Sequence, residues 1–127
     1  MSAFGYRKIA DLPQIAPLFP LAGAILFPRG ALPLNIFEPR YLNMVDDALA
    51  GDRVIAMIQP VQEQTGDAPP ALARVGAIGR ITTFAETDDG RYLITLTGIA
   101  RFRIARELPL VRPYRQAELS YDDFAAD

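Results

Sequence analysis

The sequence predicts a small, mostly antiparallel β domain, with about six strands curled into a partly closed barrel and one helix between the early strands. Length and composition set the scale: 127 residues, half of them hydrophobic, suit one domain with a sizeable core. Apolar runs of strand length recur between prolines and glycines, and one stretch has helical periodicity. Glycines also interrupt the two longest strand-like segments, where they favour the bends that curl a sheet and remove its exposed edges.

The first third of the chain is rich in proline. Residues 1–14 show no clear period and are interpreted as an arm. Four prolines then interrupt the apolar segment between Ile15 and Leu34, and proline cannot donate a hydrogen bond to a strand ladder. Only short extended pieces are therefore expected here: Ile15–Phe19, Ala24–Phe27 and Leu32–Phe37.

The helix is predicted over Pro39–Ala50. Proline suits the first helical position, because the N–H that it lacks has no helical partner there. One apolar stripe recurs at helical spacing: Tyr41, Leu42, Val45, Ala48 and Leu49. Gly51 follows and is expected to end the helix in a left-handed conformation. Asp46 and Asp47 are expected to face solvent.

The rest of the chain alternates strands with turns. Arg53–Gln59 is a short, branched apolar run typical of a buried strand, and Pro60–Ala73 is a long polar loop. Val75–Thr87 and Arg91–Arg106 are predicted strands. They flank Asp88-Asp89-Gly90, a strong hairpin signal. Two segments complete the chain: a last strand over Tyr114–Tyr121 and an acidic tail over residues 122–127.

Alternation along Arg91–Arg106 predicts which side chains point inward. One face carries Tyr92, Ile94, Leu96, Ala100, Phe102 and Ile104, which are expected in the core. The other face carries Arg91, Thr95, Thr97, Arg101 and Arg103. Gly98 lies in this strand, and Gly76 and Gly79 lie in the facing strand, so bulges or bends are expected at these glycines.

The composition excludes most catalytic chemistry. The chain has no Cys and no His, which removes thiolate chemistry, the commonest general base and the commonest metal ligand. The single Lys, Lys8, belongs to no phosphate-binding glycine loop, and a Ser–Lys dyad with Ser2 would lie in the arm rather than on a rigid frame. Adjacent carboxylates fit turns and solvated surface. No catalytic, cofactor-binding or metal-binding residue is therefore expected, and the chain is not expected to be an enzyme.

Charge and hydropathy narrow the partners. A net charge of −2 gives no bulk attraction to nucleic acid or anionic membranes, and no apolar run is long enough to span a bilayer. A cytoplasmic location is expected, because residues 1–8 show no secretory signal. Arg101, Arg103 and Arg106 form a basic stripe without interleaved aromatic side chains. It is interpreted as a solvated face paired across the sheet with acidic residues.

Two clusters are candidate polypeptide-binding residues. The first comprises Ile25, Leu26 and Phe27, which cannot all be buried if their segment forms a surface edge. An exposed apolar patch beside an open strand edge accepts an extended peptide as an added strand. The second comprises Phe37, Arg40 and Tyr41 at the strand-to-helix junction. These side chains either line a groove or serve the junction itself, and the sequence favours the junction role.

An ordered set of phrases resembles the N-terminal domain of Lon proteases. The phrases are Leu18-Phe19-Pro20-Leu21, Leu26-Phe27-Pro28, Leu32-Pro33-Leu34-Asn35-Ile36-Phe37-Glu38-Pro39-Arg40-Tyr41, Val75-Gly76-Ala77-Ile78-Gly79, Asp89-Gly90-Arg91-Tyr92 and Leu96-Thr97-Gly98-Ile99-Ala100-Arg101-Phe102. They cover roughly residues 15–121. The resemblance implies a pseudo-barrel related to the PUA fold and a role in selecting polypeptide substrates. Standalone relatives continue into a helical lobe, which would begin near residues 122–127.

Three functions follow, and they stay open at this stage. We expect a non-catalytic module that binds unfolded or partly folded polypeptides, or a partner protein, with no cofactor. The alternative is an RNA-binding PUA-like module, against which the acidic balance and the missing aromatic platform both count. The third, a small enzyme built on carboxylates alone, has the least support.

Overall fold

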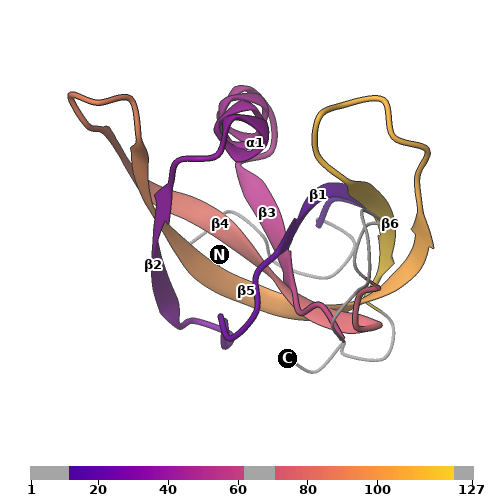
Figure 1. Cartoon of the computed structure of the whole chain (residues 1–127). Coiled ribbons are helices and arrows are strands. Elements are labelled where there is room, and N and C mark those ends of the chain that lie inside the picture. The colour runs from indigo at the N-terminus through magenta and orange to yellow at the C-terminus, as the bar shows by residue number, and fades with distance from the viewer. Residues whose placement is uncertain (1–11, 62–70, 122–127) are drawn as a thin grey trace.

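The computed structural model describes residues 12–61 and 71–121, which form six strands and one helix. In chain order the elements are β1 (Ile15–Pro20), β2 (Ala31–Ile36), α1 (Pro39–Ala50), β3 (Val54–Ile58), β4 (Val75–Glu86), β5 (Tyr92–Glu107) and β6 (Gln116–Ser120). One sheet has the order β2-β5-β4-β3-β1-β6, and β6 also pairs with β5. Five strands therefore close a ring, β2 is added outside it, and α1 lies above (Figure 1). The predicted mainly β, partly closed barrel with one helix is confirmed.

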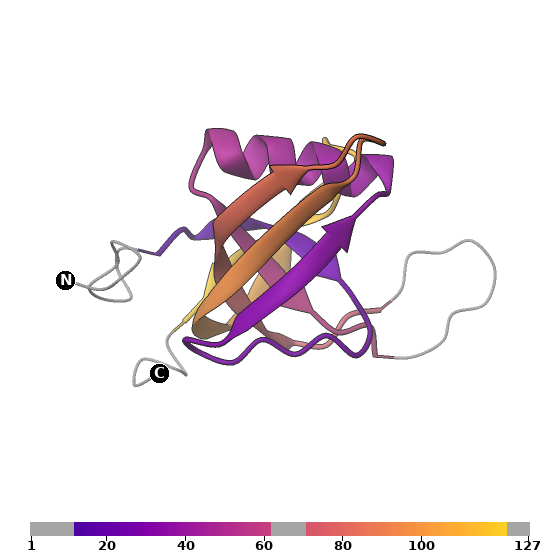
Figure 2. The same cartoon turned by 90° about the vertical axis from the view of Figure 1, so that its left-hand side faces the viewer.

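Strand β5 closes the ring because it has two partners along one edge. Its first half, Tyr92–Thr97, pairs with β2, and its last residues, Arg103–Glu107, pair with β6. The opposite edge pairs with β4 (Figure 2). The pairing moves from Gly79 opposite Gly98 to Ile78 opposite Ala100, which leaves Ile99 as an extra residue. This bulge bends the strand, as the glycine at position 98 predicts.

The same bulge divides the core in two, because one extra residue reverses the faces of a strand. The ring core, inside the closed ring, contains Leu12, Ala16, Leu18, Val54, Ala56, Ile58, Ile78, Ala100, Phe102, Ala117, Leu119 and Tyr121. The helix core, between the ring, β2 and α1, contains Phe19, Leu26, Ile36, Met44, Val45, Ala48, Ile55, Met57, Ile81, Ile94, Leu96 and Tyr114. The prediction that Ile94, Leu96, Ala100 and Phe102 share one face was therefore wrong: they are buried, but on opposite faces of the sheet.

Helix α1 has the predicted bounds but not the predicted ending. Gly51 has φ −120°, and the left-handed residue is Arg53, with φ 63°. The Arg53 N–H donates to the Ala48 carbonyl at 2.8 Å, so the turn extends two residues beyond the glycine. Asp46 is exposed, as expected, and Asp47 is half-buried; their carboxylates accept hydrogen bonds from the hydroxyls of Tyr92 (2.7 Å) and Tyr114 (2.6 Å). These bonds tie α1 to β5 and to the segment before β6.

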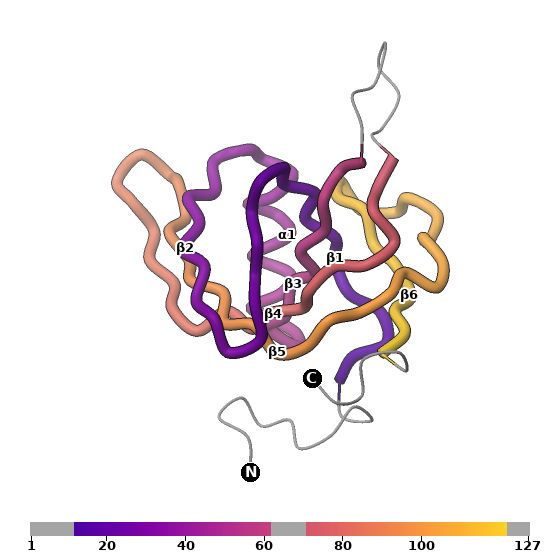
Figure 3. The backbone as a smooth tube through the Cα atoms, turned by 90° about the horizontal axis from the view of Figure 1, so that it is seen from below, coloured from indigo at the N-terminus to yellow at the C-terminus, as the bar shows by residue number. Residues whose placement is uncertain are grey.

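The segment that joins β1 to β2, residues 21–30, crosses over β4 and β5 instead of pairing along them (Figure 3). Ala24–Phe27, expected as a short extended piece, forms no strand, and only Pro28 in this segment forms an isolated bridge, to Gly98. The crossing is close. A Cβ on Gly98 would lie 2.1 Å from the Phe27 carbonyl oxygen, and one on Gly79 would lie 2.7 Å from Leu26 Cδ2. Glycine is required at position 98, because a Cβ there would meet the backbone of the crossing segment, whereas a Cβ at position 79 would displace the end of the Leu26 side chain.

Two further connections lie where the sequence predicts them. Gly90 has φ 83° in the β4–β5 turn, where the hairpin was predicted. The base of the Pro60–Ala73 loop is held by the Ala73 N–H, which donates to the Gln59 carbonyl at 2.8 Å. Most of that loop, most of the arm at residues 1–14, and the tail at residues 122–127 lie outside the described residues.

Candidate functional site

An apolar groove of about 250 Å³ lies where the β1–β2 segment crosses the sheet. Its wall is Ala24–Pro28, and its floor is the face of β3 and β4 that carries Met57 and Ala77. The full lining is Ala24, Ile25, Leu26, Phe27, Pro28, Met57, Ile58, Gln59, Val75, Gly76, Ala77 and Arg101. We call this hollow the Phe27 groove. All of these twelve residues except Gln59 and Arg101 are apolar or glycine, so the groove suits apolar side chains.

The wall of the groove alternates exposed and buried side chains. Ile25 and Phe27 are 63% and 68% exposed, whereas Leu26 is 6% exposed and belongs to the helix core. The expectation that this cluster is not wholly buried is confirmed for Ile25 and Phe27. Leu26 lines the groove as well, but its side chain is buried and fills the space over Gly79. Leu26 anchors the wall while its two neighbours stay in solvent.

Hydrogen bonds fix the backbone of this wall. The Arg29 N–H donates to the Gly98 carbonyl and the Gly98 N–H donates to the Gly30 carbonyl, both at 2.8 Å. Gln59 holds the other end: its Oε1 accepts from the Gly23 N–H at 2.9 Å and its Nε2 donates to the Ala24 carbonyl. Ile25 and Phe27 are thus presented on a fixed frame, which lowers the entropy cost of binding a partner.

The second predicted cluster lies at a different place. Phe37 and Tyr41 line a hollow of about 230 Å³ between the ends of β1 and β2, and Arg40 lines none of the hollows described here. The Tyr41 ring packs against Phe19 with centroids 4.5 Å apart, and burial raises the pKa of Tyr41. This contact supports the junction role for Tyr41. Phe37 is 64% exposed and remains a candidate contact residue.

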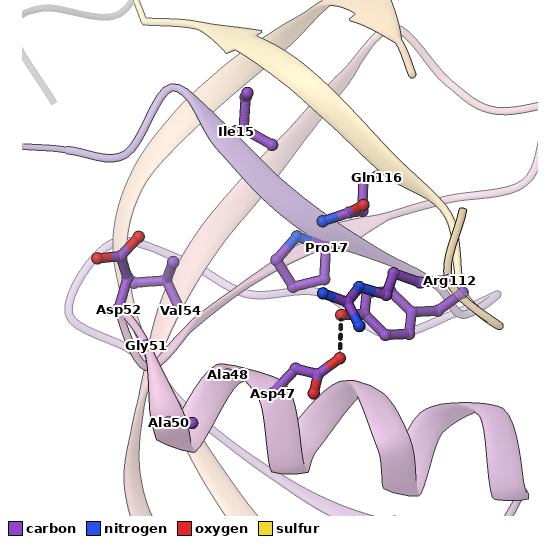
Figure 4. Close-up of a pocket in the computed structure, with 11 residues that line it drawn as sticks. Ile15, Pro17, Asp47, Ala48, Ala50, Gly51, Asp52, Val54, Arg112 and Gln116 are labelled. Atoms are coloured by element: carbon purple, nitrogen blue, oxygen red, sulfur yellow. Dashed lines mark hydrogen bonds between the residues drawn. The ribbon is translucent and has the colours of Figure 1, made fainter. Parts of the chain in front are cut away.

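A polar cleft of about 340 Å³ separates the C-terminal half of α1 from β1 and β6 (Figure 4). Asp47, Asp52, Arg112, Tyr114 and Gln116 supply its polar side chains. Burial, followed by the hydrogen bond to Asp47, raises the pKa of Tyr114 to about 12. The Asp47 carboxylate thus already has a partner in the fold. Within residues 12–61 and 71–121, no cluster of acidic side chains is arranged to hold a metal ion.

The strand edge expected beside the Ile25–Phe27 patch is poorly suited to pairing with an added strand. β2 is the edge strand, and the Gly98 N–H bonds to the Gly30 carbonyl directly before the β2–β5 ladder. Hydrogen-bonded and non-hydrogen-bonded pairs alternate along an antiparallel ladder, so the even-numbered residues of β2 form the hydrogen-bonded pairs with β5. The backbone groups of Pro33 therefore point outward, away from β5. Proline has no N–H to offer there, so β2 is a poor template for an added strand.

The family is shown by a match over most of the chain. Residues 15–126 match the model of the ATP-dependent protease La (LON) substrate-binding domain. The chain belongs to this family. Lon protease 2 of Myxococcus xanthus is 31% identical over 120 residues, and the Lon protease of Roseiflexus castenholzii is 33% identical over 110 residues. These alignments cover 94% and 87% of the chain but only 14% of each relative.

Solved structures of Lon N-terminal domains share the fold. The Lon N-terminal domain protein from Xanthomonas campestris matches with a TM-score of 0.66 and 30% identity, over 84% of this chain and 59% of that one. The N-terminal domain of the Mycobacterium avium complex Lon protease matches with a TM-score of 0.65 over 84% of this chain and 54% of that one. Its identity is 14%, so it supports the fold alone.

In this Lon substrate-binding domain, the sequence pattern predicted residues in the wall of the Phe27 groove but none in its floor. Met57 and Ala77 show no binding signal because they belong to ordinary strands. Gln59 directly follows β3, and its bond to Ala24 spans 35 residues of chain. The glycines Gly79 and Gly98 were the available signal for the groove, because a glycine inside a strand indicates that another backbone segment approaches closely. They do not indicate which segment that is. In the described part of the chain, no helix has the length and apolar character needed to cross a membrane.

Proposed function

We propose that the chain is a polypeptide-recognition module that binds unfolded or partly folded chains at the Phe27 groove without a chemical step. The observation that carries the proposal is the exposure of Ile25 and Phe27 on a backbone that hydrogen bonds hold in place. Apolar side chains fixed in water beside an apolar groove are typical of a binding surface.

The expected binding energy and the volume of the groove both fit polypeptide ligands. Burying a side chain such as Phe27 or Ile25 against a partner is worth about 1.5–3 kcal/mol. A hollow of about 250 Å³ accepts a few side chains rather than a folded domain. The family description names substrate binding, and the absence of Cys and His agrees with recognition without catalysis.

The test is a binding assay with defined ligands. Fluorescence anisotropy with a set of labelled peptides should detect binding of apolar peptides. Phe27→Ser should weaken that binding about tenfold or more. Leu110→Ser is the matched control, because Leu110 is equally exposed (68%) but lies on the β5–β6 connection outside the groove. Equal loss in both variants, or salt-dependent binding of structured RNA without peptide binding, would overturn the proposal.

A further inference from the structure

Gln59 connects the sheet to the wall of the Phe27 groove. It directly follows β3, whose five residues are all buried, and its own carbonyl accepts from the Ala73 N–H at 2.8 Å. Its side chain lines the groove and bonds to the backbone of Gly23 and Ala24, where the wall begins. The Gln59 backbone is therefore held by the sheet, and its side chain extends from that fixed point to the wall.

The two ends of the wall are held in different ways. At one end, two backbone bonds of 2.8 Å join the segment to Gly98. At the other end, residues 22–25 are hydrogen-bonded to a distant part of the described chain only through the Gln59 side chain. The Ala24 N–H donates to the nearby Leu21 carbonyl at 3.4 Å, which is a long bond within one turn. A single side chain therefore ties the first part of the wall to the sheet.

An amide side chain matches this part of the wall because the two backbone groups that it meets are of opposite kinds. Gly23 offers an N–H donor, and Ala24 offers a carbonyl acceptor. Glutamine has an acceptor oxygen and a donor nitrogen on one group, whereas an ionised glutamate has acceptors only. An ionised Glu at position 59 would keep the bond to Gly23 but place a negative oxygen against the Ala24 carbonyl.

We infer that Gln59 is a positioning residue for peptide recognition, because its amide holds the backbone that carries Ile25 over the groove. This inference rests on the proposed function and names a residue that sets the shape of its site. Ile25 is 63% exposed and belongs to neither core, so its position follows that of the backbone. A wall released from Gln59 must be ordered again when a peptide binds, which lowers the affinity.

The experiment measures how one uncharged apolar peptide binds to full-chain variants at position 59. At neutral pH, Gln59→Glu should weaken binding about three- to tenfold. At about pH 3.5 a glutamic acid side chain is mostly protonated and again has a donor. The affinity of this variant should then return toward that of the unchanged protein at the same pH. Gln59→Met removes both bonds and should bind weakly at both pH values.

Two further variants serve as controls. Gln116→Glu makes the same chemical change at a residue that is also partly buried but lies in the polar cleft, so peptide binding should not change. The second adds Gln59→Glu to Ile25→Ser, which separates positioning from direct contact with the peptide. If Gln59 acts through Ile25, the double variant should bind little more weakly than Ile25→Ser alone. Circular dichroism at both pH values checks that every variant is folded.

The outcomes separate this inference from the proposed function. Normal binding by Gln59→Glu, together with a loss in Phe27→Ser, would overturn the inference and leave peptide recognition standing. A loss in Gln59→Glu that persists at about pH 3.5, or an equal loss in Gln116→Glu, would also overturn it. Losses that add fully in the double variant would mean that Gln59 contacts the peptide directly and does not act by positioning. No effect of Phe27→Ser would overturn the proposed function and the inference with it.

Discussion

Two apolar stretches of similar composition have opposite fates in this fold. Val54–Ile58 forms β3, in which all five residues are buried. Ala24–Phe27 is just as apolar, but Ile25 and Phe27 lie in solvent. β3 has β1 on one edge, β4 on the other, and a core on each face. The other stretch crosses its neighbours, so only Leu26 finds a place inside. Composition makes burial possible, and partners on both edges and both faces make it complete.

The largest effect expected is in β3. Ile55→Ala should lower the free energy of unfolding by about 3–5 kcal/mol, because Ile55 is fully buried in the helix core and its removal leaves a cavity. Urea denaturation followed by circular dichroism measures this change. A loss below about 1 kcal/mol would mean that β3 tolerates a cavity and that the contrast with the exposed stretch is overstated.

Leu26→Ala tests the comparison within three consecutive residues. The buried side chain should contribute about 2–4 kcal/mol to stability. Ile25→Ala and Phe27→Ala are the controls, and each should change stability by less than about 0.5 kcal/mol because the side chains are exposed. Thermal and urea unfolding of the three variants should separate one anchor from two contact residues. Similar losses in all three would contradict the assigned burial.

Gly98→Ala tests how closely the segment approaches the sheet. The new Cβ would lie 2.1 Å from the Phe27 carbonyl oxygen, so backbone must move, at a cost of about 1–3 kcal/mol. Peptide binding at the Phe27 groove should fall as well, since the wall is displaced. Gly51→Ala is the control: its Cβ would meet nothing closer than the Asp47 carbonyl at 3.5 Å. Equal stability of the two variants would refute the steric account.

Tyr114→Phe gives the smallest effect and tests how α1 is held over the helix core. Loss of the hydroxyl bond to Asp47 should cost about 1–2 kcal/mol. The pKa of Tyr114 is raised from 10.0 to about 12, so the unfolded chain ionises first as pH rises. The stability that this group contributes is complete below pH 10 and is lost as pH rises through about 12. Tyr114→Phe should remove that part of the alkaline slope in urea titrations, and an unchanged slope would contradict it.

Local signals predicted most of the elements. Pro39 and the apolar stripe gave the helix bounds, and the Asp88-Asp89-Gly90 turn placed the long hairpin. Local signals did not predict features that depend on the pairing of one strand with another. Gly98 marked a bend, but only the pairing with β4 shows that Ile99 is extra and that Leu96 and Ala100 face opposite ways. The helix ending failed because Arg53, not Gly51, took the left-handed conformation.

The candidate site was predictable only in part, for a related reason. Proline and apolar residues in one segment predicted that Ile25, Leu26 and Phe27 cannot all be buried. That Leu26 alone turns inward depends on the space over Gly79, which lies 53 positions further along the chain. The floor of the Phe27 groove comes from strands that no local pattern joins to Ala24–Phe27. When a surface is assembled from distant segments, a local sequence pattern can predict only part of it.

The pairing of β6 with β1 has a consequence for biosynthesis. β6 supplies β1 with its second neighbour, through Ile15 opposite Glu118 and Pro17 opposite Gln116. A nascent polypeptide emerges from the ribosome amino end first, so β1 must wait, half-paired, until nearly all of this domain has been translated. Contacts of such long sequence separation slow folding. A molecular chaperone that covers the unpaired backbone edge of β1 during that interval would raise the yield of correctly closed molecules.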